Sequence, residues 1–426
     1  MEVKTFFRKI FGKTFYMHLK KGYYEVLAYI VYPLRHRRLI RLLKEKDVIN
    51  VVFIASTLSM WRYQNLYELL SKHPRFKVSI VILPFIAYTK DQQKSDVVGL
   101  KKYFDSLNIK YYVGEGETQF NIRKELTPDI LFYPQPYPRM FGPQNDPSSF
   151  KDRLLCYYPY DFRTSTGDWA YNWPFHNYAW KLFYSTDLHL KDAQRYAYNK
   201  GRNVEVVGYP NADNFLKKGH KDNWKPQSFH KKRIIWAPHY TISSGAYLEQ
   251  SNFLWMADLM LELAEKYFDK LQIAFKPHPR LITELYKHND WGKKKTEDYY
   301  RKWASQENTQ LETGEFIDLF MTSDAMIHDS ASFSVEYHYS LNPVMYIADN
   351  FEQHIAEKGE LGQLALRQHY LGKCKEDIIR FIEDVVLNNN DPMKQGRVDF
   401  YNKYLLPPNG KSVAENTMDV LLKAFC

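Results

Sequence analysis

The chain has 426 residues, a length that suits two α/β domains better than one core. Aromatic residues reach 16% and include 34 Tyr, which is enough for large cores and for aromatic-lined grooves. The three cysteines, Cys156, Cys374 and Cys426, are too few and too widely spaced for a disulfide framework or a metal site. We therefore expect a reducing compartment.

The net charge of +10 is concentrated at the start of the chain. Residues 1–46 hold 12 Lys/Arg and 3 Glu, a net charge of +9, whereas the other 380 residues carry +1. A nucleic-acid-binding protein more often carries its basic surface on the folded domain. We therefore expect no nucleic-acid partner.

Residues 1–46 form a basic amphipathic segment. Its second apolar stretch, 23–34, is interrupted by Glu25 and is shorter than the ~18 apolar residues of a membrane span. No small-residue cleavage site follows it, which argues against a signal peptide. We expect this segment to lie on an anionic membrane surface, so that the protein is peripheral on the cytoplasmic face. Packing on the body or on a partner subunit is the alternative. Apolar residues recur at helical spacing in its first turns: Val3, Phe6, Phe7, Ile10 and Phe11.

From residue 47 onward, short apolar stretches alternate with helical segments such as 60–72 and 96–107. This alternation predicts parallel sheets with helices on both faces. No Gly-x-Gly-x-x-Gly follows the first strand, so the dinucleotide-binding fingerprint is absent there. The first half contains seven candidate strands: 48–55, 78–83, 109–113, 130–133, 154–158, 182–185 and 204–207.

Loops rich in proline and tyrosine follow two of these strands, at 133–137 and 157–161. Open α/β folds bind ligands at the carboxyl edge of the sheet, so these loops are binding-site candidates, with ordinary loop packing as the alternative. Gly208-Tyr-Pro-Asn-Ala-Asp213 closes the first half, and the stretch 217–232 has the composition of a linker.

The second half begins with a strand at 234–236 that ends in Ala237-Pro-His239. A later strand, 271–275, ends in Lys276-Pro-His-Pro279. The two prolines fix the backbone around the histidine and hold its imidazole at the strand end. This arrangement favours a functional histidine over a structural one.

The stretch from Gly314 to Ala348 contains the best candidate for a phosphate site. A buried strand, 325–327, leads into His328-Asp-Ser-Ala-Ser332, and a helix is expected to start at once. Hydroxyls and N–H groups at a strand-to-helix turn suit a phosphate because the helix N-terminus is electropositive. Glu336 lies four residues after Ser332, on the same helical face, where its carboxylate can bind a ribose diol. The alternative is that Asp329 and Ser330 only cap the helix.

This stretch resembles the CDP-glycerol glycerophosphotransferase family, the teichoic-acid polymerases and their relatives. In that family a strand ends in Thr-Asp-Tyr-Ser-Ser and is followed by a helix with an acidic residue and by a Pro-Ile-Ile-Phe-Tyr-like strand. His328 and Ala331 depart from the family's commoner Thr and Ser. The residues that match occur in the family's order: Asp318, Asp324, Asp329, Ser330, Ser332, Glu336, Pro343 and Tyr346.

Three further segments carry the resemblance. The segment 208–213 is similar to the family's Gly-Tyr-Pro-Arg-x-Asp, with Asn211 in place of the Arg. The segment 276–279 is similar to Lys-x-His-Pro, and 409–412 to Asp-Gly-Lys-Ala/Ser. The resemblance therefore covers the half of the chain after Gly208.

The resemblance implies a GT-B fold, in which two Rossmann-like domains have a cleft between them. The expected parts are the segment 1–46, an acceptor domain at 47–225 and a donor-nucleotide domain at 226–426. The implied reaction is attack of an acceptor hydroxyl on the β-phosphate of a CDP-activated polyol, glycerol or ribitol, with CMP leaving. The acceptor is then a polyol-phosphate polymer or a lipid-linked glycan of the cell surface.

The resemblance also implies roles for residues. His278 contacts the donor pyrophosphate in the family pattern, and His239 is a second candidate there. The family's loop histidine is missing from 157–161, so Asp161 and His176 are the candidates for the base. No cofactor is expected beyond the donor, and Asp318 and Asp324 are more simply helix and turn residues, so a divalent ion is not required. The donor-binding candidates are Lys276, Asp329, Ser330, Ser332 and Glu336.

Two other functions fit the same loops. One is a GT-B glycosyltransferase that uses a nucleotide sugar in capsule or cell-wall synthesis. The other is a membrane-docked scaffold whose transferase site has decayed, as the missing loop histidine indicates. Turnover of a nucleotide donor separates the second alternative from the rest.

Overall fold

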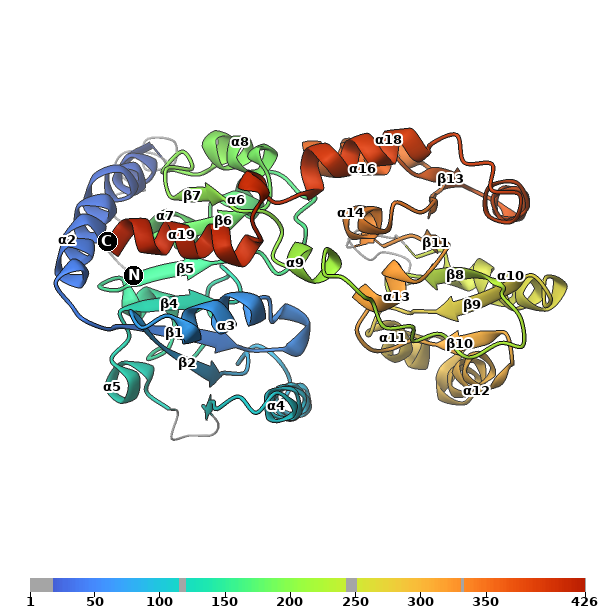
Figure 1. Ribbon diagram of the computed structural model, residues 1–426, viewed down its shortest axis with the longest axis horizontal. Coiled ribbons are helices and arrows are strands. Elements are labelled where there is room, and N and C mark those ends of the chain that lie inside the picture. The colour runs from blue at the N-terminus through green and yellow to red at the C-terminus, as the bar shows by residue number, and fades with distance from the viewer. Residues whose placement is uncertain (1–17, 115–119, 243–250, 331–332, 426) are drawn as a thin grey trace, which may run out of the picture. The chain divides into compact units, whose positions relative to one another are not determined.

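The computed structural model describes the chain except residues 1–17, 115–119, 243–250, 331–332 and 426. It forms two compact units (Figure 1). The first unit comprises Met1–Asp161, Thr166–Asp213 and Pro407–Cys426, and the second comprises Phe162–Ser165 and Asn214–Leu406. The end of the chain thus returns to the first unit. The predicted division into a domain at 47–225 and a domain at 226–426 does not include this return.

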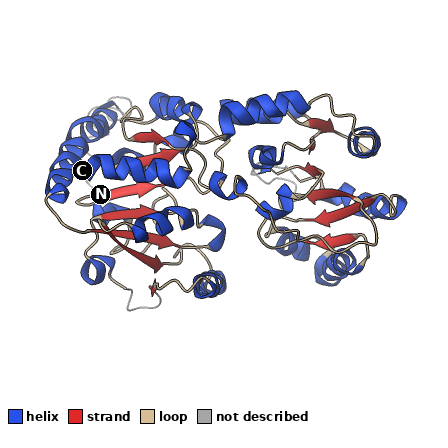
Figure 2. Cartoon of the chain, in the orientation of Figure 1, coloured by secondary structure: helices blue, strands red, loops and turns tan. Residues whose placement is uncertain are grey.

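The first unit contains a seven-stranded sheet in the order β3-β2-β1-β4-β5-β6-β7, with every pair parallel. Helices flank the strands (Figure 2). This order is Rossmann-like, and its direction reverses between β1 and β4. The strands are β1 (Ile49–Ala55), β2 (Phe76–Ile82), β3 (Tyr112–Val113), β4 (Ile130–Tyr133), β5 (Leu154–Tyr157), β6 (Lys181–Tyr184) and β7 (Val204–Val206).

Both faces of this sheet are buried, as expected for parallel strands. Val52 and Ile54 belong to the core that contains Tyr171 and Phe175, whereas Phe53 points to the other face and packs on Tyr63 at 5.2 Å between ring centres. The helical elements of this unit are η1 (Leu27–Val31), α2 (Tyr32–Lys44), η2 (Leu58–Met60), α3 (Gln64–Lys72), α4 (Lys90–Ser106), α5 (Ile122–Leu126), η3 (Pro147–Phe150), α6 (Asp168–Tyr171), α7 (Pro174–Tyr178), α8 (Asp187–Tyr196), η7 (Pro408–Gly410) and α19 (Val413–Phe425), together with α9 (Ala212–Phe215), which spans the boundary.

The returning helix α19 is pinned to the first unit by a carboxylate. Asp213 accepts hydrogen bonds from the backbone N–H groups of Val413 at 2.7 Å and Ala414 at 3.0 Å. Gly208 has φ +103°, and a Cβ there would lie 2.9 Å from Val413 Cγ2, so a larger residue does not fit. Two sequence segments about 200 residues apart therefore form one contact.

The second unit contains a six-stranded parallel sheet in the order β10-β9-β8-β11-β12-β13. This is again a Rossmann-like order, and its switch point lies between β8 and β11. The strands are β8 (Lys232–Ala237), β9 (Leu271–Phe275), β10 (Thr309–Leu311), β11 (Ala325–His328), β12 (Val344–Ile347) and β13 (Tyr370–Gly372). The helical elements are α10 (Phe253–Lys266), α11 (Leu281–Lys287), α12 (Gly292–Ser305), α13 (Ile317–Met321), α14 (Phe333–Glu336), η4 (Tyr337–Ser340), α15 (Phe351–Ala356), α16 (Glu360–Leu366), α17 (Lys375–Arg380), η5 (Phe381–Leu387), α18 (Lys394–Phe400) and η6 (Tyr401–Leu405).

The sequence predicted most strands to within two residues, and it gave β4 and β9 with their observed bounds. It missed β10 and β13, the two edge strands, which have three residues each. It also expected a full helix after Ser332, where the structure has the single turn α14 followed by the 3₁₀ turn η4.

Candidate functional site

The candidate donor site lies at the carboxyl edge of the second sheet. His239 follows β8, Lys276 and His278 follow β9, and Asp329 and Ser330 follow β11. The strands β9, β8 and β11 are adjacent and parallel, so these loops emerge side by side. The structure therefore brings together residues that the sequence spreads over about 90 positions.

His239 and His278 form a ring pair at this edge, with ring centres 5.2 Å apart. The Nδ1 atom of His239 accepts the backbone N–H of Thr241, and Nδ1 of His278 accepts that of Arg280 at 3.1 Å. The N–H contact places the proton of the neutral His278 ring on Nε2. The Nδ1 atom of His239 also lies 2.9 Å from the Thr241 hydroxyl, which can donate to it or accept from it. The pair thus offers the Nε2–H group of His278 as a donor, and that of His239 when the Thr241 hydroxyl donates to Nδ1.

Burial keeps both histidines neutral. Burial, followed by the charge of Arg280, lowers the pKa of His278 to about 4. Burial, followed by His278 and the charges of Arg280 and Lys358, lowers the pKa of His239 to about 3. The two rings are therefore uncharged hydrogen-bond donors at neutral pH.

Arg280, Tyr240 and Lys358 are neighbours of this pair that the sequence analysis did not identify. The Arg280 guanidinium lies 4.1 Å from the centre of the Tyr240 ring and donates to its hydroxyl at 3.1 Å. The Tyr240 ring in turn lies 4.5 Å from that of His278. Arg280 directly follows the Lys-Pro-His-Pro segment, a signal that could have identified it, whereas nothing near Lys358 in sequence marks it.

Asp329 joins two loops beside the pair. One carboxylate oxygen accepts the backbone N–H of His239 at 2.6 Å, and the other accepts that of Asn252 at 2.5 Å. Burial outweighs these bonds and raises the pKa of Asp329 to about 6. The sequence predicted Asp329 as a donor-binding residue. Its contacts instead place it behind the site, where it fixes His239 and the start of α10.

Lys276 is also held within the protein. Its ammonium group donates to the carbonyl oxygen of Gly314 at 2.7 Å, and the side chain is 6% exposed. Burial lowers its pKa to about 8, against the opposing effect of Glu312 and Glu315. Lys276 therefore anchors the loop after β10 to the strand end of β9.

The remaining donor candidates lie in the turn after β11. Ser330 is buried, and its backbone N–H donates to His328 Nδ1 at 3.2 Å. Ser332 lies outside the described residues. Glu336 is buried at the end of α14. Because α14 has only one turn, it supplies a much weaker dipole than the full helix that the sequence predicted.

His328, which departs from the family's Thr, belongs to a buried cluster of histidines. Its Nε2 lies 3.2 Å from Nε2 of His369, and the ring of His369 lies 4.9 Å from that of His338. Burial lowers the pKa of all three. The sequence analysis did not anticipate this cluster beneath the phosphate turn.

The two candidates for the base lie in the first unit and differ in environment. His176 is fully buried in α7, where its Nδ1 accepts the backbone N–H of Trp173 at 3.1 Å. Its carbonyl oxygen accepts hydrogen bonds from Asn199 and Asn203, which precede β7. His176 therefore lies towards the amino edge of the sheet, away from the strand ends that bind ligands, and the structure argues against its predicted role. Asp161 lies in the loop after β5, and its Oδ1 atom has no hydrogen-bond partner among the described residues. Asp161 is therefore the better candidate.

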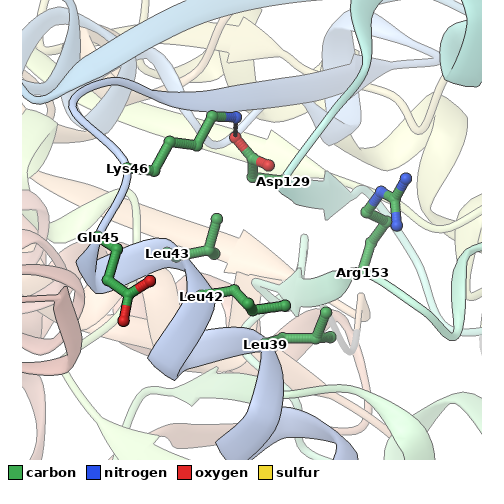
Figure 3. A pocket seen from close by; sticks show the side chains of 7 residues that line it. All are labelled: Leu39, Leu42, Leu43, Glu45, Lys46, Asp129 and Arg153. Atoms are coloured by element: carbon green, nitrogen blue, oxygen red, sulfur yellow. Dashed lines mark hydrogen bonds and ion pairs between the residues drawn. The ribbon is translucent and has the colours of Figure 1, made fainter.

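A pocket of about 460 Å³ lies elsewhere in the first unit (Figure 3). Its lining includes Leu39 and Leu42 of α2, an ion pair between Lys46 and Asp129, and Arg153. Asp129 precedes β4 and Arg153 precedes β5, so the pocket opens at the amino edge of the sheet. This edge is opposite to the one at which Rossmann-like sheets bind ligands.

In the part of the chain that the structure describes, no three His, Cys, Asp or Glu side chains gather as they would to hold a metal ion. Within the same residues, every helix is too short or too polar to cross a membrane.

The two parallel sheets in Rossmann-like order with alternating helices give the chain a GT-B-like fold. A family model described as CDP-Glycerol:Poly(glycerophosphate) glycerophosphotransferase matches residues 164–423, more than half of the chain. The chain therefore belongs to this family, and the protein is a transferase that moves a polyol phosphate from a CDP-activated donor to a polymer acceptor. This confirms the predicted family and class of reaction.

Solved structures agree with this fold. The wall teichoic acid polymerase TagF, soaked with CDPG, has a TM-score of 0.57 at 13% identity, over 96% of this chain and 97% of that chain. UDP-N-acetylglucosamine 2-epimerase from Listeria monocytogenes has a TM-score of 0.54 at 14% identity, over 89% and 97%. S. aureus MnaA with UDP has a TM-score of 0.54 at 13% identity, over 89% and 97%. At these identities the likeness concerns the fold alone, and no curated protein matches the sequence.

Proposed function

We propose that the carboxyl edge of the second sheet binds the pyrophosphate of a CDP-activated glycerol or ribitol, with His239 and His278 as the donors to its oxygens. The observation that carries this proposal is the pair of neutral rings 5.2 Å apart at adjacent strand ends, with Nδ1 of His278 occupied by a backbone N–H and its Nε2–H left to donate. Fixed donors of this kind stabilise negative charge that develops on phosphate oxygens, which is the main demand of phosphoryl transfer.

The charge around this pair suits a pyrophosphate. Arg280 and Lys358 both lie close enough to His239 to lower its pKa. Their two positive charges match the two negative charges of a pyrophosphate diester. Neutral histidines beside fixed cations can therefore bind the donor without a cofactor or a required divalent ion.

Two buried residues position the donor pair. Asp329 fixes the backbone of His239, and Lys276 fixes the loop after β10. Ser330 adds a hydroxyl at the end of β11. Ser332 and Glu336 remain proposed donor contacts, the latter through the ribose diol, for which 2′-deoxy-CDP is the direct probe.

In the proposed reaction an acceptor hydroxyl attacks the β-phosphorus of the donor. A P–O bond forms to the acceptor, the P–O bond to the bridging oxygen breaks, and CMP leaves with the electron pair. Asp161 takes the proton of the hydroxyl, for which its Oδ1 atom has a free acceptor position among the described residues.

Calorimetry with CDP and CMP tests the donor site. CDP has a β-phosphate that CMP lacks, and each hydrogen bond to a charged group contributes about 1.5–3 kcal/mol. We expect CDP to bind at least tenfold more tightly than CMP, at ~1.4 kcal/mol per decade. His278→Ala should remove most of this preference. Equal affinities for CDP and CMP in the unaltered protein would refute the pyrophosphate assignment, and a preference for UDP would favour the nucleotide-sugar alternative.

His288→Ala is a matched control for His278→Ala. His288 follows α11, and its Nδ1 accepts the backbone N–H of Asp290 at 3.2 Å, the same local bond that His278 makes with Arg280. The control therefore loses the same turn contact away from the strand ends. It should bind CDP like the unaltered protein.

The N-terminal helix gives a separate reason to propose a peripheral membrane location. The chain is helical from residue 18 to Lys44, and Tyr24 stacks on Tyr198 of the first unit at 5.8 Å. The opposite side carries an exposed apolar stripe, which we call the N-terminal stripe: Leu19, Tyr23, Val26, Ile30 and Leu34.

Arg37 and Arg41 continue the N-terminal stripe at helical spacing, and both are exposed. An exposed apolar stripe bordered by cations is the pattern of a helix that lies on an anionic lipid surface. Cationic residues near such a surface contribute about 1 kcal/mol each. The helix can therefore pack on the body with one face and on lipid with the other.

A further inference from the structure

Three strand ends of the first unit carry polar atoms without hydrogen-bond partners among the described residues. These atoms are Ser56 Oγ after β1, Gln135 Nε2 after β4 and Asp161 Oδ1 after β5. Ser56 and Gln135 are each 1% exposed. Buried polar atoms are nearly always paired, because leaving one unpaired costs stability.

The three positions belong to one edge of the sheet. The strands β1, β4 and β5 are consecutive neighbours. Phe53 of β1 and Phe132 of β4 are register partners. Ser56 lies three residues after Phe53 and Gln135 lies three residues after Phe132, so both lie at the same level beyond the strand ends. This level is the switch point between β1 and β4, where Rossmann-like sheets bind ligands.

Buried hydrogen bonds fix the three loops relative to one another. The Tyr63 hydroxyl donates to the carbonyl oxygen of Tyr133 at 2.6 Å and accepts the backbone N–H of Tyr158 at 3.3 Å. Arg62 Nε donates to the carbonyl oxygen of Tyr160 at 2.9 Å, next to Asp161. The loop after β1 therefore ties together the loops after β4 and β5, and the unpaired atoms are held in place before any ligand arrives.

We infer that Ser56 and Gln135 position the terminal diol of the acceptor, with one hydroxyl directed at Asp161. Gln135 Nε2 donates to the oxygen of the attacking hydroxyl while Asp161 Oδ1 accepts its proton. Ser56 Oγ pairs with the adjacent hydroxyl. A donor, an acceptor and a hydroxyl that can do both match a vicinal diol. The inference rests on the proposed function, because Asp161 is the base of that reaction.

This diol-binding cluster (Ser56, Gln135 and Asp161) is tested with the full chain, CDP-glycerol and a short synthetic oligo(glycerol phosphate) primer. Ser56→Ala removes a hydroxyl that makes no bond, so the melting temperature should stay the same or rise. The KM for the primer should increase about tenfold, the effect of one lost hydrogen bond, while CDP affinity measured by calorimetry stays within twofold. Gln135→Met should also raise the KM for the primer, and a primer whose terminal diol is methylated should bind poorly to the unaltered protein.

Ser149→Ala is the matched control. The Ser149 hydroxyl donates to the carbonyl oxygen of Pro143 at 2.7 Å, so its removal should lower the melting temperature slightly and leave the KM for the primer unchanged. An unchanged KM in both Ser56→Ala and Gln135→Met would overturn the inference, with or without a loss of stability. So would a failure of the unaltered protein to bind the primer while it binds CDP. A failure to bind CDP would instead overturn the proposed donor site.

Discussion

Asp329→Asn tests whether the donor pair depends on the carboxylate behind it. Each carboxylate oxygen accepts one backbone N–H, from His239 at 2.6 Å and from Asn252 at 2.5 Å. The amide has the same shape but only one acceptor oxygen. One of the two N–H groups then faces the NH₂ of the new side chain and loses its acceptor.

Two opposing effects determine the stability of this variant. Burial raises the pKa of Asp329 to about 6 from 3.8, so the ionised carboxylate carries a cost of about 3 kcal/mol at neutral pH, which the amide removes. The unpaired N–H group costs about 1–3 kcal/mol. We expect the unfolding free energy to change by less than about 2 kcal/mol at pH 7.5, while CDP affinity falls about tenfold or more as His239 loses its anchor.

The pH dependence of this comparison has a definite sign. Because the folded pKa of Asp329 is raised, its stabilising contribution is complete below the unfolded value of 3.8 and is lost as the pH rises through about 6. The unfolding free energy of the variant should therefore be lowest relative to that of the unaltered protein near pH 4, and the difference should shift in favour of the variant towards pH 7.5. Chemical denaturation at both pH values measures this difference.

Asp324→Asn is the control, at the opposite end of β11. Asp324 accepts the backbone N–H of Arg233 at 2.8 Å and the ammonium group of Lys232 at 3.2 Å. Because the ion pair between Asp324 and Lys232 is partly exposed, the substitution should lower the unfolding free energy by at most about 1 kcal/mol. CDP affinity should not change. The reasoning fails if Asp329→Asn binds CDP as tightly as Asp324→Asn at a temperature where both are folded.

Three other predictions follow from the same structure. Ile30→Asp in the N-terminal stripe should reduce cosedimentation with phosphatidylserine vesicles, whereas Val98→Asp, on the exposed face of α4, should not; equal loss would contradict the lipid proposal. The melting temperature should fall as the pH is lowered from 6.5 to 4. The folded-state pKa values of His278 and His328 are lowered to about 4 and about 3, so the stability that these neutral rings contribute is fully present above the unfolded value of 6.5 and is lost as the pH falls below it. A flat profile would show that these rings do not limit acid stability. Gly208→Ala should cost about 1–3 kcal/mol in chemical denaturation, and clearly more than Gly219→Ala, which has φ +76° but no atom within 4 Å of the new Cβ.

The sequence predicted the parts of the fold that depend on buried apolar runs. The central strands β4 and β9 consist almost entirely of buried residues, and their bounds were read directly from such runs. The edge strands β10 and β13 have three residues each and include polar or glycine positions, Gln310 and Gly372. An edge strand has one neighbour and a partly open face, so its sequence lacks the apolar run that marks a central strand.

The candidate site was predicted less completely, because its contacts join distant segments. His239, His278 and Ser330 could be named from strand ends alone. Asp329 was read as a ligand or a cap, and its actual partners lie 90 and 77 residues away. Lys358 acts on His239 through space, so no local pattern indicates it. His176 was proposed from its position near the missing loop histidine, and only the structure shows that it lies in the core.

The segments that resemble the family divide into two kinds. Gly208–Asp213 and the start of α19 bond to each other, and together they return the chain to the first unit. Gly208 allows a positive φ and a close approach to Val413, and Asp213 accepts two backbone N–H groups, so these segments indicate the fold. The segments after β9 and β11 instead place ring nitrogens and a hydroxyl at the carboxyl edge of the second sheet, so they indicate the chemistry of the site. A decayed transferase would still need the first kind to fold but not the second. This chain keeps the neutral pair His239 and His278, with Asp329 buried at a cost in free energy to hold His239 in place, which favours an active donor site over a scaffold.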